Sequence, residues 1–302
     1  MESHLKHDSA EEIEIPVPWG YIRGKWWGPR HIKPIIGLHG WQDNAGTFDK
    51  LAPLLPSDIS LLAIDLPGHG RSSHFPCGQN YFLYWDGLMV VRRIVKHFKW
   101  NKISIIGHSL GGGIGFLYAG SYPDEIDHLV CIDIAGPVIA DDKKRVPNTR
   151  VIIDKLLGYE KSLDKVFPAY TYEEAADLVM NAYQGSLTRE SCEILMKRGL
   201  EKSQDGKGFH FSRDVRLKFA GLGYLHKELI MEYAANIRCK VLNIKGKPGM
   251  VFDKEEFYRE VLEKLKDSAQ HFEFHEVPGT HHLHLNNPEN VAPIILKFLG
   301  ND

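Results

Sequence analysis

The sequence predicts an α/β fold in which helices cover both faces of a mostly parallel sheet. Short apolar runs typical of buried strands alternate with segments of helical spacing through residues 1–136, and this alternation returns in residues 226–302. Residues 137–225 carry segments of helical spacing and no comparable strand-like run. We therefore expect one α/β core made of residues 1–136 and 226–302, with residues 137–225 inserted as a helical lid over the carboxyl edge of the sheet.

The individual elements are predicted from their apolar patterns. The first two strand-like runs are close enough to pair as a hairpin, and most later runs have the continuous apolar character of buried parallel strands. The predicted strands are residues 12–17, 21–27, 33–40, 59–66, 102–109, 128–135, 239–246 and 271–279. The predicted helices are residues 46–55, 81–98, 110–122, 150–163, 172–184, 189–200, 254–266 and 288–299.

The composition argues against several classes of function. The 302 residues carry a formal net charge of −2 and no extended basic run, so nucleic acid is not an expected partner. No stretch is apolar for long enough to span a bilayer, and the polar start of the chain resembles neither a signal peptide nor a transit sequence. The chain end shows no peroxisomal signal. We therefore expect a cytoplasmic protein that acts on a small molecule.

The pentapeptide GHSLG at residues 107–111 has the G-x-S-x-G pattern of a serine nucleophile. An apolar strand leads into it and a glycine-rich helix start follows, so a sharp turn would expose the Ser109 hydroxyl at the carboxyl edge of the sheet. His108 precedes this serine, and Gly107 and Gly111 relieve the crowding at such a turn. The alternative is that Ser109 only caps the helix; the context favours the nucleophile.

A second motif, LHGWQDN at residues 38–44, supplies backbone amides for an oxyanion. A predicted strand ends at Gly40, and the next backbone N–H, that of Trp41, can point toward a substrate carbonyl. Together with the N–H of Leu110 it would form a two-donor oxyanion hole. Gly40 could also be a simple turn glycine and Trp41 a packed aromatic, and neither role conflicts with the hypothesis because only the backbone is used.

Three histidines crowd the loop after the last predicted strand, in the sequence THHLH. His281 lies at the loop tip, where its imidazole could reach Ser109, and we predict that it is the general base. His282 and His284 are expected to pack or to form hydrogen bonds, with His284 supporting the loop. A zinc site is the competing interpretation, but the chain contains neither HExxH nor HxHxDH, so we expect no metal.

Four segments resemble motifs of the α/β-hydrolase superfamily in the order that this family uses: LHGWQDNAGTFDKL, IDLPGHGRSS, GHSLGGG and VPGTHHLHLNNPENVAPIILKFL. More closely, PWGYIRGKWWG, HGWQDNAGTFD and FKWNKISIIGHSLGG resemble the animal serine hydrolase-like proteins, which include the insect kraken proteins. The resemblance covers nearly the whole chain and is weakest across the predicted lid. It implies an α/β-hydrolase fold with an eight-stranded sheet, a Ser–acid–His triad and hydrolysis of an ester-like bond without a cofactor.

The acid of this triad is missing from the position that the resemblance implies. Most superfamily members carry an Asp three residues after a glycine that corresponds to Gly246, and here Gly249 stands in its place. The next carboxylate in the chain is that of Asp253, four residues further on. Asp253 comes just before the predicted helix 254–266 and is well explained as its N-cap.

Asp133 is the alternative acid, because it ends an apolar strand 24 residues after Ser109. Some superfamily members place the acid after this strand, next to the strand of the nucleophile. The cost of burying the Asp133 carboxylate would be offset by a hydrogen bond to His281 and by the charge of its imidazolium. We favour Asp133 over Asp253, while the resemblance implies that Asp65 organises a glycine-rich turn.

The sequence therefore predicts a carboxylesterase-like serine hydrolase that forms an acyl-enzyme on Ser109. The Tyr, Phe, Leu and Met residues of the predicted lid favour a small to medium, mostly apolar ester. Thioesterase or lyase activity could use the same triad. A non-catalytic ligand-binding or receptor protein built on this scaffold is the alternative from another class.

Overall fold

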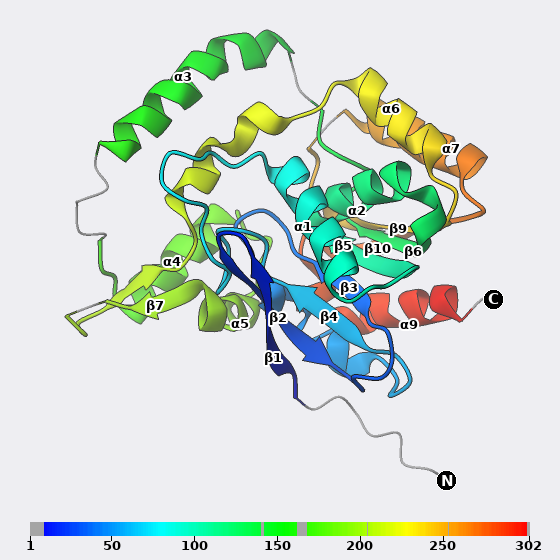
Figure 1. Ribbon diagram of the computed structural model, residues 1–302, viewed down its shortest axis with the longest axis horizontal. Helices are drawn as coiled ribbons and strands as arrows, with labels where there is room; N and C mark the ends of the chain where they lie inside the picture. The colour runs from blue at the N-terminus through cyan, green and yellow to red at the C-terminus, as the bar shows by residue number, and fades with distance from the viewer. Residues whose placement is uncertain (1–8, 140–141, 162–167, 204, 253, 301–302) are drawn as a thin grey trace.

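An eight-stranded, mostly parallel sheet forms the centre of the protein (Figure 1). The computed structural model describes residues 9–139, 142–161, 168–203, 205–252 and 254–300. The strand order is β1-β2-β4-β3-β5-β6-β9-β10; β2 is antiparallel to β1 and β4, and the remaining pairs are parallel. The strands are β1 (Glu11–Val17), β2 (Gly20–Trp27), β3 (Ile35–Leu38), β4 (Leu61–Ile64), β5 (Ile103–His108), β6 (Ile126–Ile132), β9 (Lys240–Gly249) and β10 (His271–Thr280). The predicted α/β-hydrolase fold is confirmed.

Helices cover the sheet on both faces. One hydrophobic core packs α1, α2, α6 and α7 against the strands, and a second packs α9 and two short 3₁₀ helices against the other face. All residues of β3 and β4 are buried, as expected for parallel strands covered on both sides. The bounds are α1 (Leu83–His97), α2 (Leu110–Ser121), α6 (Lys227–Asn236), α7 (Glu255–Ser268), α8 (Leu283–Asn286) and α9 (Pro288–Leu299), with 3₁₀ helices η1 (Ala45–Phe48), η2 (Ala52–Leu54) and η3 (Pro123–Glu125).

The single helix predicted over residues 46–55 is wrong, because η1 and η2 divide this stretch. Asn44 caps η1 with a side-chain bond to the N–H of Gly46, and a new turn starts at Ala52. Pro53 stands at the beginning of that turn and has no N–H to continue a helix from the preceding residues. The stretch therefore breaks where the proline stands.

The chain between β6 and α6 adds no strand to the eight-stranded sheet within the described residues. Its elements are α3 (Asp142–Glu160), α4 (Tyr172–Ala182), α5 (Arg189–Gly199), β7 (Leu200–Lys202), β8 (Phe209–Phe211) and the 3₁₀ helix η4 (Val215–Gly223). The expectation of helices alone is wrong here, because β7 and β8 form an antiparallel pair. Asp205 and Gly206 form the turn between them; Gly206 has a φ of +71°, and Asp205 accepts a bond from the Lys207 N–H.

A buried ion pair fastens this intervening segment to the sheet. The Arg198 side chain of α5 is 4% exposed and donates to Asp65, which follows β4, at 2.8 Å. Asp65 also accepts from the Arg71 N–H at 2.9 Å, so it holds the glycine-rich turn as the family resemblance implies. No described helix is both long and apolar enough to cross a membrane.

Candidate active site

Ser109 occupies a strained turn between β5 and α2. Its φ and ψ angles are 51° and −118°, a backbone conformation that residues other than glycine rarely adopt. A side chain on Gly107 would approach the Gly111 carbonyl to 2.3 Å, and one on Gly111 would approach the Leu38 carbonyl oxygen to 2.1 Å. The Ser109 side chain makes no capping bond to α2, so the structure does not support the alternative of a simple helix cap.

The turn after β3 lies directly against this serine. A Cβ atom on Gly40 would be 3.4 Å from the Ser109 Cβ and 3.0 Å from His108 Nδ1. Trp41 follows with a side chain that is 45% exposed, and its indole donates to the Leu217 carbonyl of η4 at 3.2 Å. The loop that carries the predicted oxyanion amide is therefore bound to the segment between β6 and α6.

Asp133 and His281 meet at the carboxyl edge of the sheet. The Asp133 Oδ2 atom lies 2.6 Å from His281 Nδ1, and both side chains are buried. Asp133 comes directly after β6 with a φ of 52°, and its N–H donates to Ile244 of β9 at 2.7 Å. His281 comes directly after β10. The structure thus brings together two residues that are 148 positions apart in the chain.

Three further donors stabilise the Asp133 carboxylate. Lys245 Nζ lies 3.0 Å from Oδ1, the Gly246 N–H donates to Oδ1 at 2.9 Å, and the Met250 N–H donates to Oδ2 at 2.8 Å. Hydrogen bonds to a charged group offset the cost of removing it from water. The sequence analysis did not identify Lys245. Its position near the end of the predicted strand 239–246 was a usable signal, because Asp133 also lies near the end of a predicted strand.

Residue 249, where most superfamily members are expected to carry the acid, has no room for a side chain in this structure. Gly249 has a φ of +57°, and a Cβ atom on it would lie 2.6 Å from Asp133 Oδ1. An acid at residue 249 and a carboxylate at Asp133 would therefore compete for the same space. Asp253, the alternative acid, lies outside the described residues.

A cluster of histidines surrounds the Ser109 turn. His108 is fully buried, and its Nε2 donates to the His281 carbonyl at 2.8 Å, which joins the serine turn to the histidine loop. His282 bonds through Nδ1 to the Ser186 hydroxyl at 2.6 Å, and His284 bonds through Nε2 to the Thr47 hydroxyl at 2.8 Å. The predicted hydrogen-bonding roles of His282 and His284 are confirmed by these contacts.

Asp43, a residue that the sequence analysis did not single out, completes a possible ligand set with His108 and His282. One atom from each lies within 4.8 Å of the others, and all three side chains are buried. Asp43 Oδ2 is 3.9 Å from His108 Nδ1 and 3.8 Å from His282 Nε2. These separations exceed the roughly 3.3 Å between ligands of a tetrahedral zinc ion, so the arrangement does not fit zinc without movement.

Burial keeps five histidines around the site neutral. They are His39, His69, His108, His282 and His284. Loss of hydration lowers the pKa of His39 to about 4 and that of His284 to about 3, and it holds the pKa of the other three well below the ordinary value. Around neutral pH these imidazoles therefore serve as uncharged donors and acceptors.

We predict a steep loss of stability in mild acid. Unfolding returns the five imidazoles to a pKa of about 6.5, so the unfolded chain binds more protons than the folded chain below that pH, and stability falls as the pH falls. Burial raises the pKa of Asp43 to about 7 and of Asp86 to about 6, which opposes this trend. With a net uptake of two to three protons, the free energy of unfolding should fall by about 3 kcal/mol per pH unit near pH 5.5. Urea unfolding between pH 7.5 and 5.5 measures this; a flat profile would contradict it.

The comparisons with known proteins identify the family of the chain. The family model of the alpha/beta hydrolase fold matches residues 33–288. A probable serine hydrolase of Drosophila melanogaster is 48% identical over 98% of this chain and 89% of its own, and a serine hydrolase-like protein of Danio rerio is 37% identical over 96% and 89%. The crystal structure of a hypothetical protein of Pseudomonas aeruginosa superposes with a TM-score of 0.84 at 31% identity, over 96% of this chain and all of its own. These matches support hydrolysis as the general reaction. The chain belongs to the α/β-hydrolase superfamily and, within it, to the serine hydrolase-like proteins.

Proposed function

We propose that the chain cleaves carboxylic esters through an acyl-enzyme on Ser109. The observation that carries this proposal is the 2.6 Å contact between His281 and the buried Asp133. The strained turn that holds Ser109, as the G-x-S-x-G motif requires, supports the same proposal. Family membership supports the general reaction, and the roles of the individual residues are our inference.

In the proposed mechanism, the Asp133 carboxylate accepts a hydrogen bond from the N–H at Nδ1 of His281. The proton therefore stays on Nδ1, and Nε2 is free to remove the proton of Ser109. The serine oxygen attacks the ester carbonyl, and the backbone N–H groups of Trp41 and Leu110 stabilise the oxyanion. His281 then protonates the departing alcohol. A water molecule activated by the same imidazole hydrolyses the acyl-enzyme and restores the serine.

We further propose that residues 137–225 act as a lid over this site. The contacts of Arg198 with Asp65 and of Trp41 with Leu217 support this placement, because both join the segment to loops at the carboxyl edge of the sheet. A lid in this position would select the substrate, and our prediction is a small to medium, mostly apolar ester. A thioester could enter the same mechanism, since the leaving group is all that differs.

A fluorophosphonate probe separates an enzyme from a binding protein on the same scaffold. Such a probe reacts covalently only with an activated serine, so we expect stoichiometric labelling of Ser109 at pH 7.5, located by peptide mass spectrometry. His281→Ala should abolish labelling, because the serine then lacks its base. Absence of labelling in a folded protein whose Ser109→Ala variant still binds an ester would refute the enzyme proposal.

A further inference from the structure

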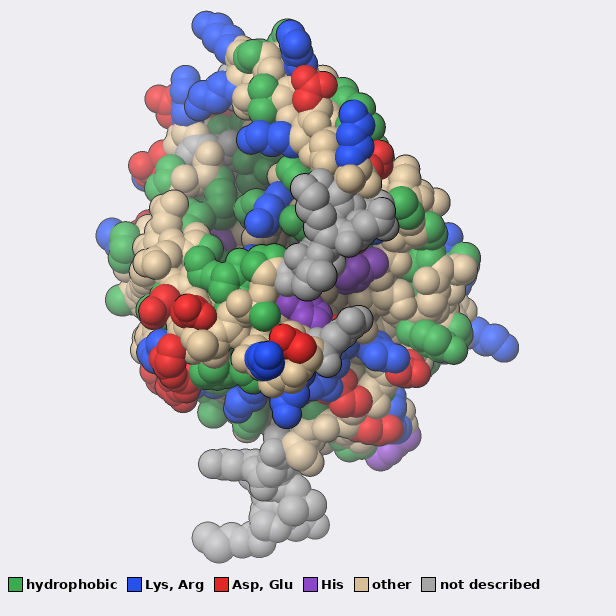
Figure 2. Space-filling view, turned by 90° about the vertical axis from the view of Figure 1, so that its left-hand side faces the viewer, with side chains coloured by type: hydrophobic (Ala, Val, Ile, Leu, Met, Phe, Trp, Pro, Cys, Tyr) green, Lys and Arg blue, Asp and Glu red, His purple; other side chains and the backbone are tan. Residues whose placement is uncertain are grey.

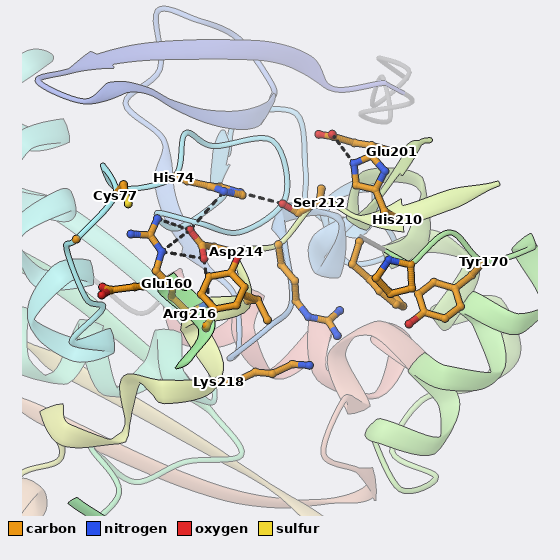
Figure 3. A pocket seen from close by; sticks show the side chains of 16 residues that line it. His74, Cys77, Glu160, Tyr170, Glu201, His210, Ser212, Asp214, Arg216 and Lys218 are labelled. Atoms are coloured by element: carbon orange, nitrogen blue, oxygen red, sulfur yellow. Dashed lines mark hydrogen bonds and ion pairs between the residues drawn. The ribbon is translucent and has the colours of Figure 1, made fainter. Parts of the chain in front are cut away.

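A cavity of about 410 Å³ lies against the proposed lid, between its elements and the loop that carries His74 and Cys77 (Figure 3). Figure 2 shows a hollow on the face that carries this segment, with hydrophobic and basic side chains inside it. The walls of the cavity contain several charged groups, and some of them are paired with a neighbour. Asp214 pairs with Arg216 at 2.6 Å and lies 3.3 Å from His74, and Glu201 lies 3.4 Å from His210.

Arg213 is a charged residue of this wall that takes part in none of these pairs. Its half-buried guanidinium stacks over the Phe211 ring, with 4.3 Å between Cζ and the ring centre. Within the described part of the chain it forms no hydrogen bond and no ion pair with a carboxylate. Burial lowers the pKa of Arg213, a sign that the charge is held away from water. A partly desolvated cation without a counter-ion is costly, so its presence in a cavity wall calls for a function.

Lys218 provides a second cation in the same wall. It forms no ion pair within the described residues, and it follows Leu217, whose carbonyl holds the Trp41 indole. Glu160, which forms no ion pair within the described residues, also lines the cavity (Figure 3). The wall therefore holds two cations, Arg213 and Lys218, that form no ion pair with a described carboxylate.

The cavity wall contacts the proposed oxyanion loop, because the Leu217 carbonyl, next to Lys218, accepts the Trp41 indole N–H at 3.2 Å. In the same loop, the N–H of Gln42 donates to His69 Nε2 at 3.1 Å; the pKa of His69 is lowered mainly by burial, then by His39 and more weakly by Arg213. Gln42 directly follows Trp41, whose N–H is the proposed oxyanion donor. A molecule that reaches from Ser109 past this loop would therefore meet the cavity wall that holds Arg213.

We propose that Arg213, assisted by Lys218, binds a carboxylate of the substrate at a distance from the ester that is cleaved. The planar guanidinium offers two parallel N–H donors that match the two oxygens of a carboxylate, and the Phe211 ring fixes its plane. The preferred substrate is then a mono-ester of a dicarboxylic acid with an apolar chain between its two ends. This inference rests on the proposed ester hydrolysis and adds the substrate class.

Two esters of the same length test the proposal. The para-nitrophenyl mono-ester of adipic acid differs from para-nitrophenyl hexanoate only in a terminal carboxylate in place of a methyl group. The wild-type chain should show the higher kcat/KM on the adipate ester. Arg213→Gln should lower kcat/KM for the adipate ester about 10- to 100-fold, the value of a hydrogen bond to a charged group, and leave the hexanoate within about twofold. Lys207→Gln, a change at an exposed lysine in the β7–β8 turn, is the matched control and should alter neither.

Binding measurements keep this test separate from the test of catalysis. In a Ser109→Ala background, calorimetry should show tighter binding of the adipate ester than of the hexanoate, and Arg213→Gln should remove the difference while Arg213→Lys retains part of it. Equal losses on both esters would mean that Arg213 is merely structural and would overturn the proposal. Equal binding of both esters in the presence of Arg213 would overturn it as well. Hydrolysis of neither ester, with the binding preference intact, would instead refute only the catalytic proposal.

Discussion

Ser109→Ala is expected to lower kcat for para-nitrophenyl hexanoate by about 10⁶-fold, the scale seen when a serine hydrolase loses its nucleophile. The reason is that the whole two-step reaction passes through a bond to this oxygen. The change removes one buried hydroxyl that makes no capping bond, so the fold should persist. Steady-state rates measured beside circular dichroism spectra of the same samples test the prediction.

Ser104→Ala is the matched control for this variant. Ser104 lies on β5, the strand that leads into the Ser109 turn, and its hydroxyl faces His128 at 3.4 Å rather than the proposed site. It should keep its activity within about twofold. Retention of a tenth or more of the activity in Ser109→Ala would show that the ester is cleaved elsewhere.

Asp133→Asn is expected to reduce kcat by about 10⁴-fold at pH 7.5, as the equivalent change does in a serine protease. An amide at this position can present its NH₂ group to His281 and so favour the tautomer that cannot accept the serine proton. With the NH₂ group in the place of Oδ2, the amide oxygen still accepts from the Gly246 N–H and from Lys245, which should keep the variant folded, while the Met250 N–H loses its acceptor. Initial rates and a urea unfolding curve, recorded together, measure both effects.

Asp253→Asn provides the comparison, since Asp253 is the alternative acid of the sequence analysis. We expect it to change kcat far less than Asp133→Asn. Equal mild effects of both variants would refute the assignment of Asp133, and a larger effect of Asp253→Asn would transfer the role to Asp253.

The sheet and the serine turn were predictable because each leaves a local signature in the sequence. Four-residue runs such as Leu61–Ile64 are apolar throughout only when both faces of a strand are buried. The meeting of Asp133 with His281 could also be anticipated, since a charge at the end of a buried strand needs a partner. The absence of an acid at Gly249 pointed in the same direction.

Other parts of the site depend on contacts that no short segment specifies. Arg213 looks like an ordinary surface residue until the fold shows that no described carboxylate reaches it. Asp43 lies in a family motif, yet its neighbours His108 and His282 come from distant parts of the chain. The β7–β8 hairpin was missed for a different reason: its three-residue strands are too short for a pattern, although the Asp205–Gly206 pair signals a turn.

The pairing of β6 with β9 has a consequence for the synthesis of the chain. β6 ends at Ile132 and its neighbour begins at Lys240, so at ordinary elongation rates roughly 5 to 20 seconds separate the two strands on the ribosome. During that interval the apolar end of β6 is an open edge that can pair with other chains. The strand that delivers Asp133 thus keeps an open edge until β9 emerges, and β9 is also the strand that brings Lys245 to the acid.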